Sequence, residues 1–114
     1  MAYNGWTNYK TWNVALWIDN DQGSYSQRQS MAEEAWENAS ACRTFTRLER
    51  ATLDLADALK DWIEEMNPLG NDASMFSDLL SAALGEVDWH EIAENFMSDV
   101  DQEEEEEEED NNEV

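Results

Sequence analysis

A chain of 114 residues with 28 acidic and 6 basic side chains has a formal net charge of −22, which repels DNA, RNA and anionic lipid and attracts basic protein surfaces. Its single cysteine, Cys42, excludes an intramolecular disulfide bond. No run approaches the roughly 20 apolar residues of a membrane span, and the first residues lack the basic and apolar regions of a secretory signal. We therefore expect a cytoplasmic protein with no membrane and no nucleic-acid partner.

The negative charge is concentrated in the second half of the chain. Residues 1–60 hold 8 acids and all 6 bases, a net of −2, whereas residues 61–114 hold 20 acids and no base. Ten of these acids lie in residues 101–114, where Glu103–Glu109 is an unbroken run. We predict an acidic helical domain over residues 1–100 and a disordered polyglutamate tail over residues 101–114.

Two helices are predicted in the first 41 residues. Thr7 is the expected N-cap of a helix over residues 7–20, with Tyr9, Trp12 and Leu16 on its buried stripe. The apolar residues at 12, 14, 16 and 18 also alternate as in a strand, but the length and the cap favour a helix. Gly23 is expected to break the chain, and a second helix is expected from about 26 to 41. Its apolar face comprises Met31, Ala32, Ala35, Trp36 and Ala39.

The clearest helix follows, because Thr46 and Glu49 form a capping box at its start. Pro68 and Gly70 mark its end. Its apolar seam recurs in steps of four and three residues and comprises Leu48, Thr52, Leu55, Leu59, Trp62 and Met66. This seam packs either within the chain or across a homodimer, and the sequence leaves both alternatives open.

Two short helices complete the predicted domain. Ser74 caps the first, which Gly85 ends; Asp88 and Glu91 form a second capping box for the other, which reaches Val100. The first should direct Phe76, Leu79, Leu80 and Ala83 inward, and the second Trp89, Ile92, Phe96 and Val100. The fold class is therefore all-α, a compact bundle of about four to five helices. Its core should include Trp12, Trp36, Trp62 and Trp89, whereas Trp6 and Trp17 are either core residues or exposed anchors.

Two groups of acids are candidates for a partner-binding surface. The first lies on the long helix, opposite its apolar seam, and comprises Asp54, Asp57, Asp61, Glu64 and Glu65. The second comprises Asp78, Glu86, Asp88, Glu91, Glu94 and Asp99. Solvated helix faces are usually charged, but they mix the two signs, and here no base follows Lys60. Neighbouring like charges cost a few tenths of a kcal/mol per pair, which favours a functional acidic surface.

Metal binding and catalysis have little support. Residues 19–30 begin like a calcium-binding loop, but the glycine comes one position early and Ser30 replaces the closing glutamate. His90 is expected at the surface and Cys42 in a half-buried structural position, and neither has the partners of a catalytic site in the sequence. We therefore expect a non-enzyme with no cofactor and no metal.

The segment GWTNYKTWNVALWIDND, residues 5–21, resembles the opening of a family of small phage- and mobile-element-associated proteins with the pattern Thr-Asn-Tyr-x-Thr-Trp-Asn-Val. That family has no assigned activity, so the resemblance implies origin more than mechanism. In charge, size, helicity and its glutamate-rich end, the chain is also similar to the Ocr-type anti-restriction proteins of phages. Those proteins block type I restriction enzymes by imitating DNA.

The leading hypothesis is therefore a phage-encoded DNA mimic that occupies the DNA-binding cleft of a basic host protein or complex. A restriction–modification enzyme is the first expected target, and a CRISPR effector or another defence nuclease is the next. The alternative is a small interaction or scaffold protein that binds through an apolar patch around Trp6 and Trp17, with acidity serving solubility. A third hypothesis is an acidic chaperone for basic proteins, which would show little selectivity among basic partners. Binding by charge must weaken steeply as salt rises, whereas apolar binding should weaken little.

Overall fold

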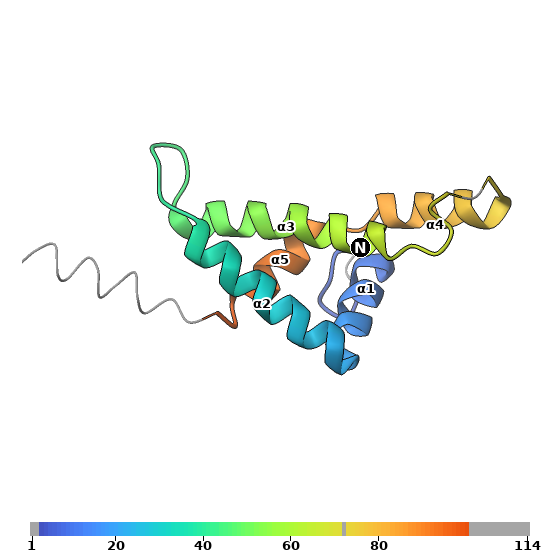
Figure 1. Ribbon diagram of the computed structural model, residues 1–114, viewed down its shortest axis with the longest axis horizontal. Coiled ribbons are helices and arrows are strands. Elements are labelled where there is room, and N and C mark those ends of the chain that lie inside the picture. Colours follow the sequence, from blue (N-terminus) through green and yellow to red (C-terminus); the bar gives the residue numbers. More distant parts are fainter. Residues whose placement is uncertain (1–2, 72, 101–114) are drawn as a thin grey trace, which may run out of the picture.

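The computed structural model describes residues 3–71 and 73–100 (Figure 1), and these residues form five helices without a sheet. This result confirms the predicted all-α fold, whereas the predicted disorder of residues 101–114 lies outside the described residues. None of these helices is long and apolar enough to cross a membrane. The helices are α1 (Tyr9–Asn20), α2 (Gln22–Asn38), α3 (Arg47–Glu65), α4 (Met75–Gly85) and α5 (Trp89–Met97).

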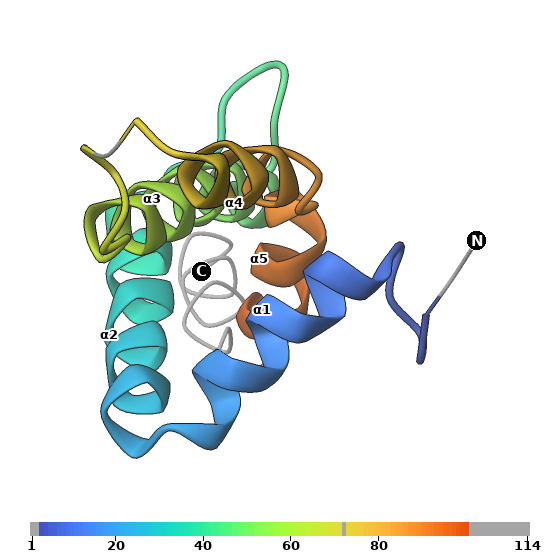
Figure 2. The same cartoon turned by 90° about the vertical axis from the view of Figure 1, so that its right-hand side faces the viewer.

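The core lies between α3 and the helices beside it. Helix α3 packs along α5 and α2, and α1 packs against α2 and α5; Figure 2 looks along α3 and shows α2 and α5 beneath it, with α1 on the lower side. Leu55, Leu59, Ile92 and Phe96 are fully buried there, and burying each contributes about 1.5–3 kcal/mol. The centre of the α3 seam therefore packs within the chain. Only its end residues, Leu48 and Met66, are exposed.

The N-cap of α1 is Asn8, so the prediction of Thr7 was wrong. The Oδ1 atom of Asn8 accepts hydrogen bonds from both the backbone N–H and the hydroxyl of Thr11, each at 2.8 Å. Its Nδ2 atom donates to the backbone oxygen of Glu86 at 2.9 Å, and Thr11 Oγ1 accepts from the backbone N–H of Asp88 at 2.9 Å. These partners, far away in the sequence, decide where α1 begins, and they attach its start to the start of α5.

Two further predictions for the first half were wrong. Helix α2 begins at Gln22 because the Asp21 carboxylate accepts the backbone N–H of Ser24 at 2.9 Å. This hydrogen bond also lowers the pKa of Asp21. Gly23 therefore lies in the first turn and breaks nothing. Helix α2 then ends at Asn38 instead of Ala41. In α1 the buried residues are Thr11, Ala15 and Ile18, so the predicted stripe of Tyr9, Trp12 and Leu16 is displaced.

Arg28 of α2 is buried, although no pattern in the sequence predicts this. Its Nε atom lies 3.1 Å from Oδ1 of Asp19, and its Nη1 atom lies 3.0 Å from Oδ2 of Asp99. The guanidinium group also stacks over the rings of Tyr25 and Phe96, at 4.5 and 4.3 Å from their centroids. Because Asp19 is in α1 and Asp99 follows α5, this one side chain joins three helices through charge and stacking.

Helices α4 and α5 depart from the prediction in different ways. Ser74 and Asp88 are the N-caps, as predicted. However, the second capping box is incomplete, since the Glu91 carboxylate accepts the backbone N–H of Thr7 at 2.9 Å in place of its own cap. Helix α4 packs along none of the other described helices. As a result, Phe76 and Leu79 are exposed, and their predicted inward orientation was wrong.

The six tryptophans divide into three kinds. Trp36 is buried, and Trp6, Trp62 and Trp89 pack half-buried against the core. Trp12 is half-buried and contacts Tyr3 and Tyr9, with ring centroids 5.0 and 5.5 Å apart. Trp17 is exposed. Trp6 and Trp17 therefore do not form one exposed patch.

Candidate functional site

The acids of α3 form an exposed row along one face of the helix. All five, Asp54, Asp57, Asp61, Glu64 and Glu65, are exposed, as their predicted position opposite the seam requires. With a rise of 1.5 Å per residue they span about 16 Å in four intervals, which is roughly one carboxylate per 4 Å. One strand of DNA carries one phosphate per 3.4 Å. The linear charge density of the row is therefore somewhat lower than that of a single DNA strand, and the exposed Lys60 reduces it further.

The end of this row opposes the dipole of its own helix. Glu64 and Glu65 are the last two residues of α3, and the last turn contains no base. The C-terminus of a helix carries partial negative charge, so an acid there is unfavourable by about 0.3–1 kcal/mol. These two acids therefore do not serve the stability of α3.

The second acidic group is mostly engaged inside the molecule. Its members fall on α4, on α5 and in the segments that follow these helices, so the structure does not bring them into one row. Glu86 lies 3.0 Å from Lys10, Asp88 caps α5, and Glu91 accepts the N–H of Thr7. Glu94 lies 3.4 Å from His90, and Asp99 lies 3.0 Å from Arg28.

Asp78, in the first turn of α4, is the exception in this group. Its exposed carboxylate has no hydrogen-bond or ion-pair partner among the described residues. The second group is therefore chiefly a set of caps and ion pairs, and the α3 row is the better candidate surface.

Four of the six bases also have partners inside the described part of the chain. Lys10 and Arg28 pair with Glu86, Asp19 and Asp99, as described above. The Arg47 guanidinium donates two hydrogen bonds to the backbone oxygen of Trp36, at 2.9 and 3.1 Å, and stacks on its ring. Arg50 lies 3.6 Å from Asp54, one turn along α3. Of the acidic row, only Asp54 has an ion-pair partner among the described residues.

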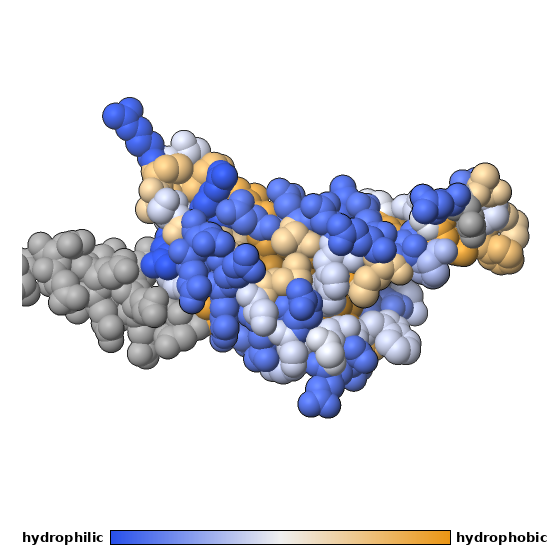
Figure 3. Space-filling model, in the orientation of Figure 1, coloured by the Kyte–Doolittle hydropathy of each residue, from blue (hydrophilic) through white to orange (hydrophobic). Residues whose placement is uncertain are grey.

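Helix α2 adds acids that were not included among the candidates. Glu33, Glu34 and Glu37 are exposed on α2, which packs beside α3. In Figure 3, hydrophilic residues cover much of the face over α2 and α3, and the outer end of α4 is hydrophobic. The sequence places these glutamates on the solvent side of α2, and their exposure agrees with that position.

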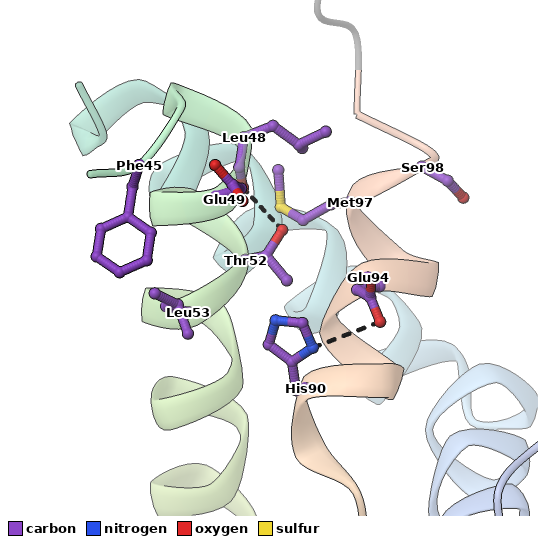
Figure 4. Close-up of a pocket in the computed structure, with 9 residues that line it drawn as sticks. All are labelled: Phe45, Leu48, Glu49, Thr52, Leu53, His90, Glu94, Met97 and Ser98. Carbon is purple, nitrogen blue, oxygen red and sulfur yellow. Dashed lines mark hydrogen bonds and ion pairs between the residues drawn. The ribbon is translucent and has the colours of Figure 1, made fainter. Parts of the chain in front are cut away.

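A hollow of about 340 Å³ between α3 and α5 is the place where His90 lies (Figure 4). Its walls are apolar, from Phe45, Leu48, Leu53 and Met97. Its polar groups have partners: His90 contacts Glu94, the Thr52 hydroxyl donates to the backbone oxygen of Leu48, and the Ser98 hydroxyl donates to that of Asn95. No nucleophile is paired with His90 in this hollow, so the geometry does not build a catalytic pair.

Cys42 is exposed, so its expected half-buried position was wrong. Backbone hydrogen bonds from Thr44 and Phe45 lower the pKa of its thiol.

Within residues 3–71 and 73–100, no group of three His, Cys, Asp or Glu side chains has the arrangement of a metal site. The segment that begins like a calcium loop is instead the corner between α1 and α2, where Asp21 is a helix cap and Asp19 pairs with Arg28.

These features define the class of protein: a small helical protein with a chain-wide charge of −22 and an exposed acidic row on α3. Within the described part of the chain, Asp54 is the member of this row that has an ion-pair partner. The chain belongs to a family of unknown function, DUF7249, whose model matches residues 1–111. No curated protein and no solved structure matches the chain significantly.

Proposed function

We propose that this protein is a phage-encoded DNA mimic that acts by binding and not by catalysis. It occupies the DNA-binding cleft of a host defence complex in the host cytoplasm, a restriction–modification enzyme first and a CRISPR effector or another nuclease next. The observation that carries the proposal is the exposed α3 row, whose last acids oppose the dipole of their own helix. These acids oppose the dipole of α3 and have no ion-pair partner among the described residues. A basic surface on another protein would give them a partner.

The chemistry of such a cleft fits the row. Lys and Arg side chains that normally contact phosphates can make charge-assisted hydrogen bonds to carboxylates. Binding then releases the ions around both surfaces, as phosphate binding does. Asp57, Asp61 and Glu64 are held on a helix that a capping box starts and a buried seam fixes. The row therefore loses little conformational entropy when a partner binds.

The test is inhibition of DNA cleavage by a panel of purified type I restriction enzymes and CRISPR effector nucleases, measured at several salt concentrations. The row variant is D57N/D61N/E64Q. The matched control is E33Q/E34Q/E37Q on α2, which changes the net charge equally. We expect wild-type inhibition to weaken steeply with salt and the row variant to inhibit at least about tenfold less than the control. Equal loss in both variants would mean that net charge alone acts, and undiminished inhibition by the row variant would refute the proposal.

One observation favours the alternative of an apolar interaction protein. Trp17 is 69% exposed. Because tryptophan is enriched at protein interfaces, an exposed tryptophan is a candidate contact for a partner. Trp6 packs against the core, so the binding patch of that alternative would contain Trp17 without Trp6. Partner capture that survives high salt and is lost in a W17S variant would support it against the mimic.

A further inference from the structure

Helix α4 belongs to an arm, residues 66–71 and 73–85, that projects past the C-terminal end of α3 (Figure 1). The loop before α4 folds onto it, since the Ser77 hydroxyl donates to the backbone oxygen of Leu69 at 3.1 Å. The residue after α4, Glu86, is fixed to α1 by the ion pair with Lys10 and the hydrogen bond from Asn8. The end of the arm after α4 is therefore anchored to α1, the loop of the arm is fixed on α4, and the outer half of the arm projects away from the body.

The arm presents an apolar face to solvent. Met75 and Phe76 are each 66% exposed and Leu79 is 62% exposed, all on α4. Such a cluster of large apolar side chains on one projecting helix is unusual for a monomer and is typical of an interaction surface. The sequence pattern predicted that Phe76 and Leu79 are buried, but the described residues of the chain do not bury them.

A complementary surface lies on the body. A hollow of about 390 Å³ between α1 and the end of α3 is lined by apolar side chains that include Val14, Trp17, Ile63 and Met66. Trp17 is 69% and Met66 is 53% exposed. The arm and this hollow are thus two apolar surfaces of one chain, neither of which is covered among the described residues.

We propose that a second copy of this chain covers them: the arm of each copy packs into the hollow of the other, giving a symmetric dimer. Such an exchange is closed by a twofold axis, because each copy contributes the same two surfaces. The inference goes beyond the proposed inhibition of a nuclease and does not depend on it.

The area is sufficient for a dimer. With about 200 Å² for a large side chain, the exposed fractions of Met75, Phe76, Leu79, Trp17 and Met66 amount to roughly 600 Å² per copy. Two copies would bury roughly 1,200 Å² through these side chains alone, which reaches the lower bound of stable interfaces. Neighbouring residues of the arm and the hollow add to it.

The charge distribution also favours a second copy at this place. The arm, residues 66–85, includes only Asp72 and Asp78 as acids, whereas residues 61–114 as a whole hold 20. Among the residues that line the hollow, Asp21 is the charged one. Two chains of charge −22 repel each other least where both are nearly neutral, and added salt weakens the remaining repulsion.

The test is sedimentation of the purified full chain over a range of concentrations and salt. The variants are F76S/L79S in the arm and W17S in the hollow. L48S is the matched control, because Leu48 is also exposed and lies about 27 Å from Met66 along α3. We expect a dimer that tightens as salt rises, a dissociation constant raised at least about tenfold in both test variants, and no change in the control. Circular dichroism verifies that every variant remains helical.

Mixing the two test variants makes the experiment decisive. In a mixed dimer, the intact arm of the W17S chain meets the intact hollow of the F76S/L79S chain, so one contact is restored. We therefore expect the mixture to associate more tightly than either variant alone. A monomer at all salts and concentrations, a dimer that ignores the arm variant, or a mixture that associates no better would each overturn the proposal. A salt-strengthened dimer is also distinguishable from nuclease binding, which salt weakens.

Discussion

The two acidic groups of this protein differ in what their carboxylates contact. Glu86, Asp88, Glu91, Glu94 and Asp99 each have a base or a backbone N–H as partner inside the chain. On α3, by contrast, Asp57, Asp61, Glu64 and Glu65 are exposed and have no such partner among the described residues. The same residue types thus serve the fold in one place and are left for solvent or a partner in the other.

The difference shows why net charge is a poor guide to function. A count of acids in residues 54–100 treats both groups alike, yet internal partners are widespread in only one of them. A well-formed cap is worth about 1 kcal/mol and an exposed ion pair roughly 0–1 kcal/mol, so the carboxylates of the second group have roles within the fold. The last two acids of the α3 row oppose the dipole of their helix, and for this row we propose a cause outside the chain. Substitutions in the two groups should therefore have opposite signs.

The largest effect is expected at the buried Arg28. The variant D19N/D99N leaves its guanidinium group without a carboxylate, and a buried unpaired charge is costly. Because both aspartates are partly solvent-accessible, we expect a loss of about 2–3 kcal/mol in the free energy of unfolding, measured with urea.

Adding Arg28→Met to this variant removes the unpaired charge and should recover most of the stability. D57N/D61N, which removes two charges from the α3 row, should lose nothing. If the two double variants were equally stable, the distinction between engaged and unpaired acids would be wrong.

The sequence predicted α3 well because the determinants of that helix are local. Thr46 and Glu49 are three residues apart and cap each other, and the seam repeats at helical spacing, so no distant partner is needed. The exposed acidic row follows directly, since it lies opposite the seam. This local consistency is why the α3 part of the candidate site could be read from the sequence.

The errors occurred where distant contacts decide the structure. Asn8 replaces Thr7 as a cap because the segment at Glu86 binds its side chain, and Glu91 leaves its own cap for the N–H of Thr7. The partners of Arg28 lie 9 and 71 residues away. Likewise, the apolar spacing of α4 predicted a buried face but could not show that the chain leaves Phe76 and Leu79 uncovered.

A middle-sized effect is expected at the cap of α5. D88A removes the side-chain acceptor of the Glu91 N–H and should lower stability by about 1 kcal/mol, as loss of an N-cap usually does. D57A on α3 is the matched change, since it also replaces an aspartate by alanine. Alanine favours a helix interior, so D57A should be neutral or slightly stabilising. Thermal unfolding of both variants and the wild type measures the two effects. Destabilisation by D57A as large as that by D88A would show an unrecognised structural role for the row.

The smallest effect on the free energy of unfolding is expected at the end of α3, and its sign tests whether the last acids of the row serve the fold. Glu64 and Glu65 end α3 next to the negative end of its dipole, with no base in the last turn. E64Q/E65Q should therefore raise the free energy of unfolding by about 0.5–1 kcal/mol at low ionic strength, and the gain should shrink as salt screens the dipole. If the same variant also inhibits a target nuclease less than wild type, stability and binding are opposed at these two positions. A loss of stability would instead assign the glutamates to the fold and remove the main reason to seek a partner for the row.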